Sequence, residues 1–279
     1  MSYVPEFVAL YEIFPYIEYL PLDDETIRVA VKDYLAGGET MNAIIKKYGK
    51  IEDWNTSEVT DMSKLFCMAC KFNQSIGDWD VSKVTDMERM FMCCESFNQP
   101  IGRWNTSSVI TMSRMFYCAH NFNQDISKWD VSSVTNMNEI FYDAYKFNQP
   151  IGDWDTSKVN DMYYMFKDAR SFNQPIGNWD VSNVTNMGRM FMFAHDFNQP
   201  IENWDVSKVT YMYGMFHFAE TFNQPIGRWN TSNVTNMDIM FHSAKDFNQS
   251  IRDWNTSNVT SRLGMFGRII YRQGRMCLF

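Results

Sequence analysis

Hydrophobic and polar residues follow one pattern that repeats every 25 residues over most of this chain. The second copy, residues 76–100, reads IGDWDVSKVTDMERMFMCCESFNQP. When the columns of each copy are numbered from its isoleucine, Trp fills column 4, Val column 9 and Phe column 16 in all nine copies. The copies occupy residues 51–275 without insertion or deletion. A fixed period of this length predicts a solenoid in which each unit stacks on its neighbours.

Two periodicities within one copy predict its elements. Ile76, Trp79 and Val81 match the start of a leucine-rich pattern, and the polar residues between Trp79 and its neighbours predict a short strand. From Val84 the apolar spacing changes to three and four, which predicts a short helix or 3₁₀ turns. The sequence Asn98-Gln99-Pro100 is expected to end this helix or 3₁₀ segment. The predicted fold class is an α/β repeat solenoid, leucine-rich-repeat-like, with short parallel strands and short helical or 3₁₀ turns in nine coils.

Polar columns that hardly vary predict ladders along the stack. Ser82 in column 7 recurs in every copy, and Asn98 in column 23 recurs in eight. A coil leaves backbone groups unpaired in its tight turns, and side chains such as these can satisfy them. We therefore expect both columns to bond backbone amides rather than a ligand.

Residues 1–50 do not repeat and predict a helical N-terminal cap, since the end units of a solenoid need covering. Asp24 is the expected start of a helix that ends at Gly37, and a second helix from Met41 ends at Gly49. The aromatic-rich residues 5–22 predict either a third helix or a segment that docks a partner. Residues 276–279 are expected to form a C-terminal tail.

Composition and motifs narrow the function classes. The net charge of −8 argues against nucleic acid as a partner, because phosphate binding needs a basic patch. No catalytic or phosphate-loop motif occurs, so we expect neither an enzyme nor a cofactor. Four of the six Cys lie in the first two copies, which favours free thiols over a disulfide framework, although Cys93 and Cys118 share a column and a disulfide between them stays open. The CxxC spacing of Cys67 and Cys70 lacks a second ligand pair, so no metal is expected.

The N-terminal residues show no basic segment followed by an apolar run, and no segment is long enough to span a bilayer. An intracellular location is therefore expected, with the cell surface as the alternative.

The residues around the copy boundary resemble a known family. Phe97, Ile101, Trp104 and Val109 fall in a motif similar to the BspA-type leucine-rich repeats, in the branch built on FNQPIGxWDxSxVTxMxxMF. The resemblance covers about four-fifths of the chain. This branch is similar to surface lipoproteins of mycoplasmas and other bacteria, and to abundant proteins of protists and large DNA viruses. For the bacterial members the resemblance implies adhesion and protein binding.

Recognition is expected where exposed columns differ between copies. Columns 3 and 8 flank the predicted strand on its outer side and carry mixed charge, which suits a protein partner. The candidate surface consists of Asp53, Asp78, Arg103, Lys128, Asp153, Arg228 and Asp253 in column 3, and Glu58, Lys83, Lys158 and Lys208 in column 8. The expected function is a non-enzymatic protein-binding or scaffold solenoid that uses this strand-side surface. The alternatives are a surface adhesin of BspA type and a substrate adaptor with an N-terminal docking segment.

Overall fold

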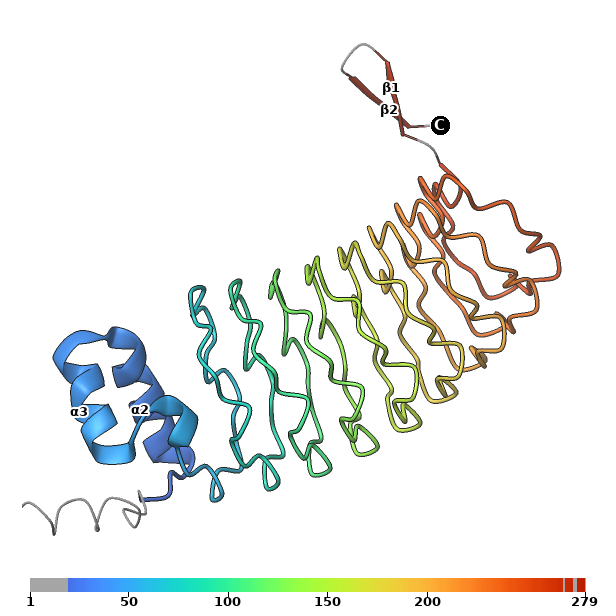
Figure 1. Cartoon of the computed structure of the whole chain (residues 1–279). Coiled ribbons are helices and arrows are strands. Elements are labelled where there is room, and N and C mark those ends of the chain that lie inside the picture. Colours follow the sequence, from blue (N-terminus) through green and yellow to red (C-terminus); the bar gives the residue numbers. More distant parts are fainter. Residues whose placement is uncertain (1–19, 268, 273–274, 279) are drawn as a thin grey trace, which may run out of the picture.

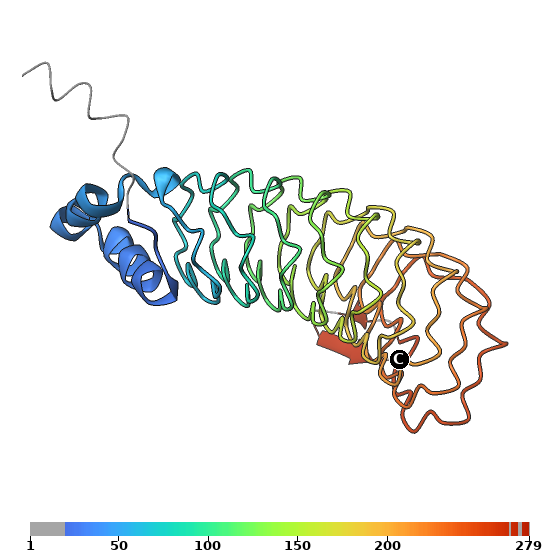
Figure 2. The same cartoon turned by 90° about the horizontal axis from the view of Figure 1, so that it is seen from below.

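A helical pair at one end is followed by nine coils laid side by side along a curved stack (Figure 1). The computed structural model describes residues 20–267, 269–272 and 275–278. Seen from below, the coils keep the same order and the two helices cover only the first of them (Figure 2). The elements are α2 (Asp24–Ala36), α3 (Gly38–Tyr48), the 3₁₀ turn η2 (Ile51–Asp53), β1 (Ile269–Arg272) and β2 (Arg275–Leu278).

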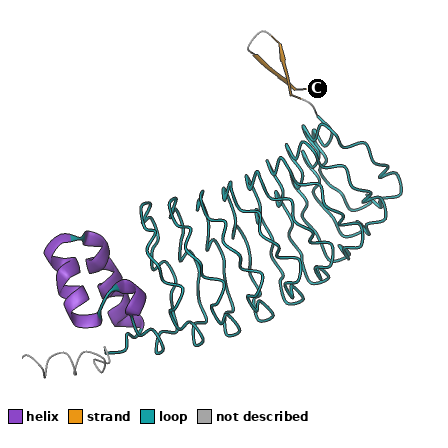
Figure 3. Ribbon diagram, in the orientation of Figure 1, coloured by secondary structure: helices purple, strands orange, loops and turns teal. Residues whose placement is uncertain are grey.

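Over residues 51–267 the coils contain no strand, so the predicted α/β fold class with short parallel strands is wrong. Figure 3 draws the coils as loops and turns, with helices confined to the N-terminal end. Adjacent coils share one isolated parallel bridge in column 11, as between Asp61 and Asp86. β1 and β2 form a separate antiparallel hairpin in which Ile269 lies opposite Leu278.

Successive tight turns replace the predicted helix. The Met90, Met92 and Cys94 N–H groups donate to carbonyls three residues back at 3.2, 3.1 and 3.0 Å. Arg89 and Cys93 have φ of 56° and 58°, the left-handed conformation that a type II turn requires at its third residue. Successive β-turns of this kind bury every third or fourth side chain, which reproduces the apolar spacing of a short helix.

The remaining amides of this segment join one coil to the next. The N–H groups of Met87, Arg89, Phe91 and Cys93 donate to carbonyls of the following coil at 2.7–3.2 Å. Alternate amides therefore close turns within a coil and bond along the stack, which satisfies the buried backbone without a strand.

Aromatic columns fill the interior. The column-16 rings Phe91 and Phe116 stack with centroids 5.6 Å apart, and Trp104 stacks on Trp129 at 6.2 Å. The Trp104 Nε1–H donates to the Ile76 carbonyl of the preceding coil at 3.1 Å. All nine Trp side chains are buried, and from Trp79 onward each Trp N–H closes a turn with the Ile three residues back, so Trp does not begin the strand that the sequence predicted.

Polar ladders follow the stack in part as predicted. The Asn98 N–H donates to Oδ1 of Asn73 in the preceding coil at 2.9 Å, and the same bond recurs through Asn248. For column 7 the prediction is wrong, because the Ser82 side chain is not the acceptor. Its backbone N–H instead donates to Asp80 Oδ1 at 2.9 Å. The acceptor in this turn is therefore the column-5 Asp or Asn.

The helical pair caps the stack by replacing a missing coil. Asp23, and not Asp24, is the N-cap of α2 and forms a capping box with Thr26. Asp24 accepts hydrogen bonds from the Thr60 and Asp61 N–H groups at 2.7 and 2.9 Å. In the second coil the equivalent Thr85 N–H donates to the Thr60 carbonyl of the first coil. The Asp24 carboxylate thus takes the place of a preceding coil.

Three further groups extend this replacement. The Arg28 guanidinium donates to the Ser63 and Asp61 carbonyls at 2.7 and 3.4 Å. In later coils the equivalent carbonyls accept from backbone amides of the preceding coil. The Leu22 N–H donates to the Asn55 carbonyl at 2.8 Å. The Trp54 indole donates to the Gly49 carbonyl at 3.2 Å. Most of the aromatic segment at 5–22 lies outside the described residues. In the part of the chain that is described, no helix is both long and apolar enough to cross a membrane.

Candidate functional site

The eleven predicted surface residues all lie exposed on the Trp-bearing side of the coils. Asp78 and Arg103 line a cavity of about 420 Å³ beside Gly77 and Gly102. A Cβ at Gly102 would lie 2.3 Å from the carbonyl oxygen of Asp125, the last residue of the same copy. Column 2 therefore packs backbone against backbone here, and the column-3 side chains project from a fixed edge.

Several column-8 side chains bond along the stack. Lys83 Nζ lies 2.9 Å from Glu58 Oε1 of the preceding coil. Lys208 Nζ donates to Asn183 Oδ1 at 2.7 Å. Both members of the Glu58–Lys83 pair are more than half exposed, so their attraction contributes little stability. Part of the charge in column 8 is therefore neutralised before any partner arrives.

A second variable surface lies on the turn-rich side of coils three to seven. We call it the tyrosine–cation band. Its members come from columns 11, 13, 14, 17 and 20, and each contacts another member or a residue bonded to one. They are Tyr117, Tyr142, Tyr145, Tyr163, Tyr164, Lys167, Arg170, Arg189, Tyr211 and Tyr213.

Lys167 lies near the middle of the band. Its ammonium is 4.0 Å from the Tyr142 ring centroid and 3.0 Å from Asp168 Oδ2. Burial lowers the pKa of Lys167, but its bonds to the Tyr142 hydroxyl and the Asp168 carboxylate outweigh burial, so the pKa is raised overall. Burial raises the pKa of Asp143, whose Oδ1 lies 3.7 Å from Lys167. Lys167 is therefore a fixed charge held between two carboxylates.

Arg189 extends the band into the next coils. Its guanidinium lies 4.5 Å over the Tyr213 ring and bonds the Tyr164 hydroxyl. A Cβ at Gly188 would lie 2.7 Å from the Tyr211 ring and 3.1 Å from Tyr163. The absent side chain at this position lets both rings close over the backbone.

Two histidines continue this side beyond the band. The His217 and His242 rings lie 4.9 Å apart, edge to face. Burial, and then the neighbouring His242, lower the pKa of His217 to about 4. Both ring nitrogens of His217 are buried without a hydrogen-bond partner among the described atoms. His217 is therefore neutral at physiological pH and serves as an aromatic packing residue.

The thiols show no disulfide among the five described cysteines, so the bond left open for Cys93 and Cys118 is absent. Cys94 is buried, and its Sγ donates to the Phe66 carbonyl at 2.9 Å. Burial raises the pKa of the Cys94 thiol, which makes it unreactive. Over the described ranges no three metal-ligating side chains come together.

Sequence reasoning missed the band because its columns were assigned to a helix. The criterion of variation between copies applies there as strongly as in columns 3 and 8. Column 14, for example, carries Arg114, Glu139, Tyr164 and Arg189 in successive coils. Tyrosine recurring in variable columns was the signal available in the sequence.

Comparison with known proteins identifies a repeat family. The family described as "Mycoplasma protein of unknown function, DUF285" matches four overlapping segments, residues 39–144, 101–199, 122–220 and 174–273. Together the matches span 39–273, nearly the whole repeat region and α3. They confirm the coarser part of the expected resemblance, which is membership of a repeat family. No curated protein and no solved structure matches the chain.

Proposed function

The chain belongs to the repeat family of Mycoplasma proteins of unknown function, DUF285, and from this premise we propose that it is a non-enzymatic scaffold that binds a partner protein through its tyrosine–cation band. The observation that carries this proposal is the run of Tyr, Lys and Arg side chains over coils three to seven, which are partly buried and still accessible from outside. Tyr and Arg are enriched at the energetic centres of protein interfaces, where rigid amphipathic rings give large contact area.

The side chains of the tyrosine–cation band hold one another in place, which supports this proposal. Tyr117 and Tyr142 stack at 4.3 Å, and Tyr145 lies under Arg170 at 4.8 Å. Side chains held in this way lose little further rotamer freedom when a partner binds, which favours affinity. The overall acidity of the chain does not oppose a protein partner, and it continues to disfavour nucleic acid.

The surface of columns 3 and 8, on the Trp-bearing side, is the competing site on the same scaffold. It is more exposed than the band, and its eleven candidate residues are all charged, as the rim of an interface would be. Charged rims change association rates more than affinity. We therefore assign the affinity to the band and steering to the exposed charges, such as Arg103 and Lys158.

Site-specific photocrosslinking tests the assignment. A photoreactive phenylalanine analogue replaces Tyr145 in the band, and in a matched chain it replaces Lys158 in column 8. The proposal predicts one discrete adduct from position 145 and a weaker or absent adduct from position 158 at equal expression. An adduct confined to position 158 would move the binding site to the surface of columns 3 and 8 and refute the assignment to the band.

The assignment to the BspA-type branch is the finer part of the proposal, and it rests on the FNQPIGxWD motif. For that branch an adhesive role at the cell surface is the second candidate. Protease treatment of intact cells separates the two: the intracellular scaffold stays intact, whereas an adhesin is cleaved.

A further inference from the structure

The helical cap leaves part of the first coil uncovered. In every later coil the column-15 and column-17 carbonyls accept hydrogen bonds from amides of the preceding coil, as Met90 and Met92 accept from Phe66 and Met68 at 3.0 and 2.8 Å. Their counterparts in the first coil are the carbonyls of Leu65 and Cys67, which accept no hydrogen bond from any described residue. Asp24 and Arg28 replace the missing coil only as far as column 13.

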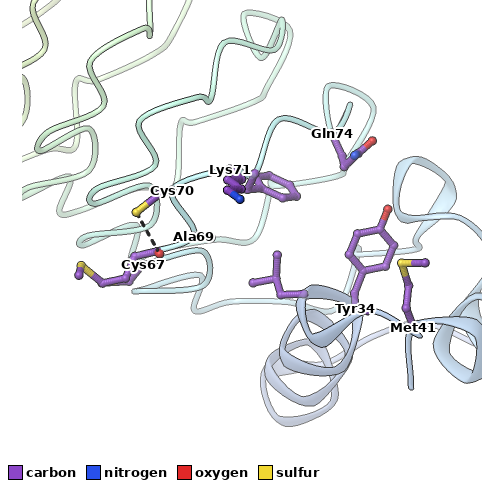
Figure 4. A pocket seen from close by; sticks show the side chains of 11 residues that line it. Tyr34, Met41, Cys67, Ala69, Cys70, Lys71 and Gln74 are labelled. Carbon is purple, nitrogen blue, oxygen red and sulfur yellow. Dashed lines mark hydrogen bonds between the residues drawn. The ribbon is translucent and has the colours of Figure 1, made fainter. Parts of the chain in front are cut away.

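A cavity begins where the replacement stops. It has a volume of about 570 Å³ and lies between the α2–α3 turn and the far end of the first coil. Figure 4 shows Tyr34 and Met41 of the helices facing Cys70 and Lys71 of the coil across it. We call this cavity the cap groove.

The walls of the cap groove are apolar and accessible. Leu35 and Met68 line it with 43 % and 64 % of their surface exposed, so the groove presents apolar side chains to solvent. Phe72 and Tyr34 add aromatic surface, and Lys71 is the sole charged residue among the described residues that line the groove. The groove therefore suits an apolar, aromatic and acidic segment that also offers an amide to the carbonyl of Cys67, which lines the groove.

We propose that residues 1–19 of this chain occupy the cap groove. This segment contains six aromatic residues, three glutamates and no Lys or Arg, so its chemistry complements the groove and Lys71. It joins the described chain at Leu20, beside the start of α2, while the groove lies at the end of that helix. α2 has 13 residues, or about 20 Å. Nineteen residues reach about 60 Å when extended, so the segment can run back along α2.

The rate at which the Cys70 thiol is alkylated measures whether the cap groove is occupied. Cys70 is exposed in the described structure and lines the groove, whereas Cys118 lies in the third coil and serves as an internal reference. Site-resolved alkylation by N-ethylmaleimide is compared in the full chain, in a chain lacking residues 1–19, and in two full-length variants. Leu35→Ser weakens the groove wall, and Val29→Ser alters another exposed side chain of the same helix outside the groove.

An occupied groove predicts slow labelling of Cys70 in the full chain and in Val29→Ser. Removal of residues 1–19 accelerates Cys70 labelling about tenfold, which corresponds to a groove that is occupied about nine-tenths of the time. Leu35→Ser also accelerates Cys70 labelling. A synthetic peptide of residues 1–19 slows it again. Equal Cys70 rates with and without residues 1–19 would overturn the proposal, as would equal acceleration at Cys118. Protection that survives the deletion and grows with protein concentration would assign the groove to a second copy instead, which also overturns it.

Discussion

The Arg28 guanidinium donates to the Ser63 carbonyl at 2.7 Å, and this bond gives the first coil what each later coil receives from its predecessor. In the second coil the equivalent Glu88 carbonyl accepts from the Lys64 N–H at 2.8 Å. Capping is therefore specific at the level of single hydrogen bonds, and each bond can be removed separately.

Substitution Arg28→Ala should destabilise the first coil by about 1–2 kcal/mol, because the Ser63 and Asp61 carbonyls lose a charged donor. Hydrogen exchange resolved along the chain measures this, and we expect faster exchange in residues 51–75 with little change in residues 151–175. Lys32→Ala on the same helix is the control, since Lys32 is exposed. Equal effects of Arg28→Ala and Lys32→Ala would contradict the capping account.

The aromatic column predicts position-dependent costs. Phe166 is fully buried between Phe141 and Phe191, so Phe166→Ala should cost about 3–5 kcal/mol. Phe266 in the last coil is 58 % exposed and, of the rings that the structure describes, stacks only on Phe241. Phe266→Ala should therefore cost less than half as much in chemical denaturation. Similar costs at the two positions would mean that the end of the stack is covered.

The left-handed backbone at column 14 predicts that glycine is favourable at this position. Lys64 has φ of 58°, a conformation that costs a non-glycine residue about 1 kcal/mol or more. Gly214 and Gly264 already occupy this column in other coils with φ of 57° and 61°. Lys64→Gly should be more favourable than Lys158→Gly by about 1 kcal/mol, since Lys158 lacks a positive φ. Thermal unfolding that ranks Lys158→Gly as equal or better would refute the turn assignment.

His217 predicts a loss of stability in mild acid. Its pKa falls from 6.5 to about 4 on folding, because burial and His242 oppose its charge. Below pH 6.5 the unfolded chain gains a proton that the folded chain does not, so stability is complete above pH 6.5 and declines towards pH 4. His217→Phe should flatten this part of the pH profile, measured by urea unfolding. His195→Phe serves as the control, and an identical flattening in both variants would exclude His217 as the cause.

The interior was predictable from the sequence because side-chain burial depends on register. Ile76, Trp79 and Phe91 recur without insertion, so stacked inward columns follow directly from the period. The predicted strand is absent, and it rested on only two alternating positions, Trp79 and Val81, which are too few to distinguish a strand from successive turns. The turns were concealed because Arg89 and Cys93 adopt positive φ although neither residue type favours it.

The candidate site shows the same division. Exposure of columns 3 and 8 followed from the pattern, and Asp78 and Arg103 are indeed exposed. The tyrosine–cation band depends on contacts across coils, such as Lys167 with Tyr142, that only the stacking geometry reveals. The role of Asp24 was hidden for a related reason, because Asp23 beside it is an equally good N-cap and only tertiary contact distinguishes them.

Calorimetric titration of the crosslinked partner against paired variants tests the proposed function most directly. Tyr142→Ala removes a ring that Tyr117 and Lys167 both contact, and Lys208→Ala removes a column-8 charge outside the band. The account predicts that Tyr142→Ala weakens binding by about 2 kcal/mol, or about thirtyfold in Kd, while Lys208→Ala changes Kd less than threefold. Undiminished affinity in Tyr142→Ala, with a large loss in Lys208→Ala, would contradict it.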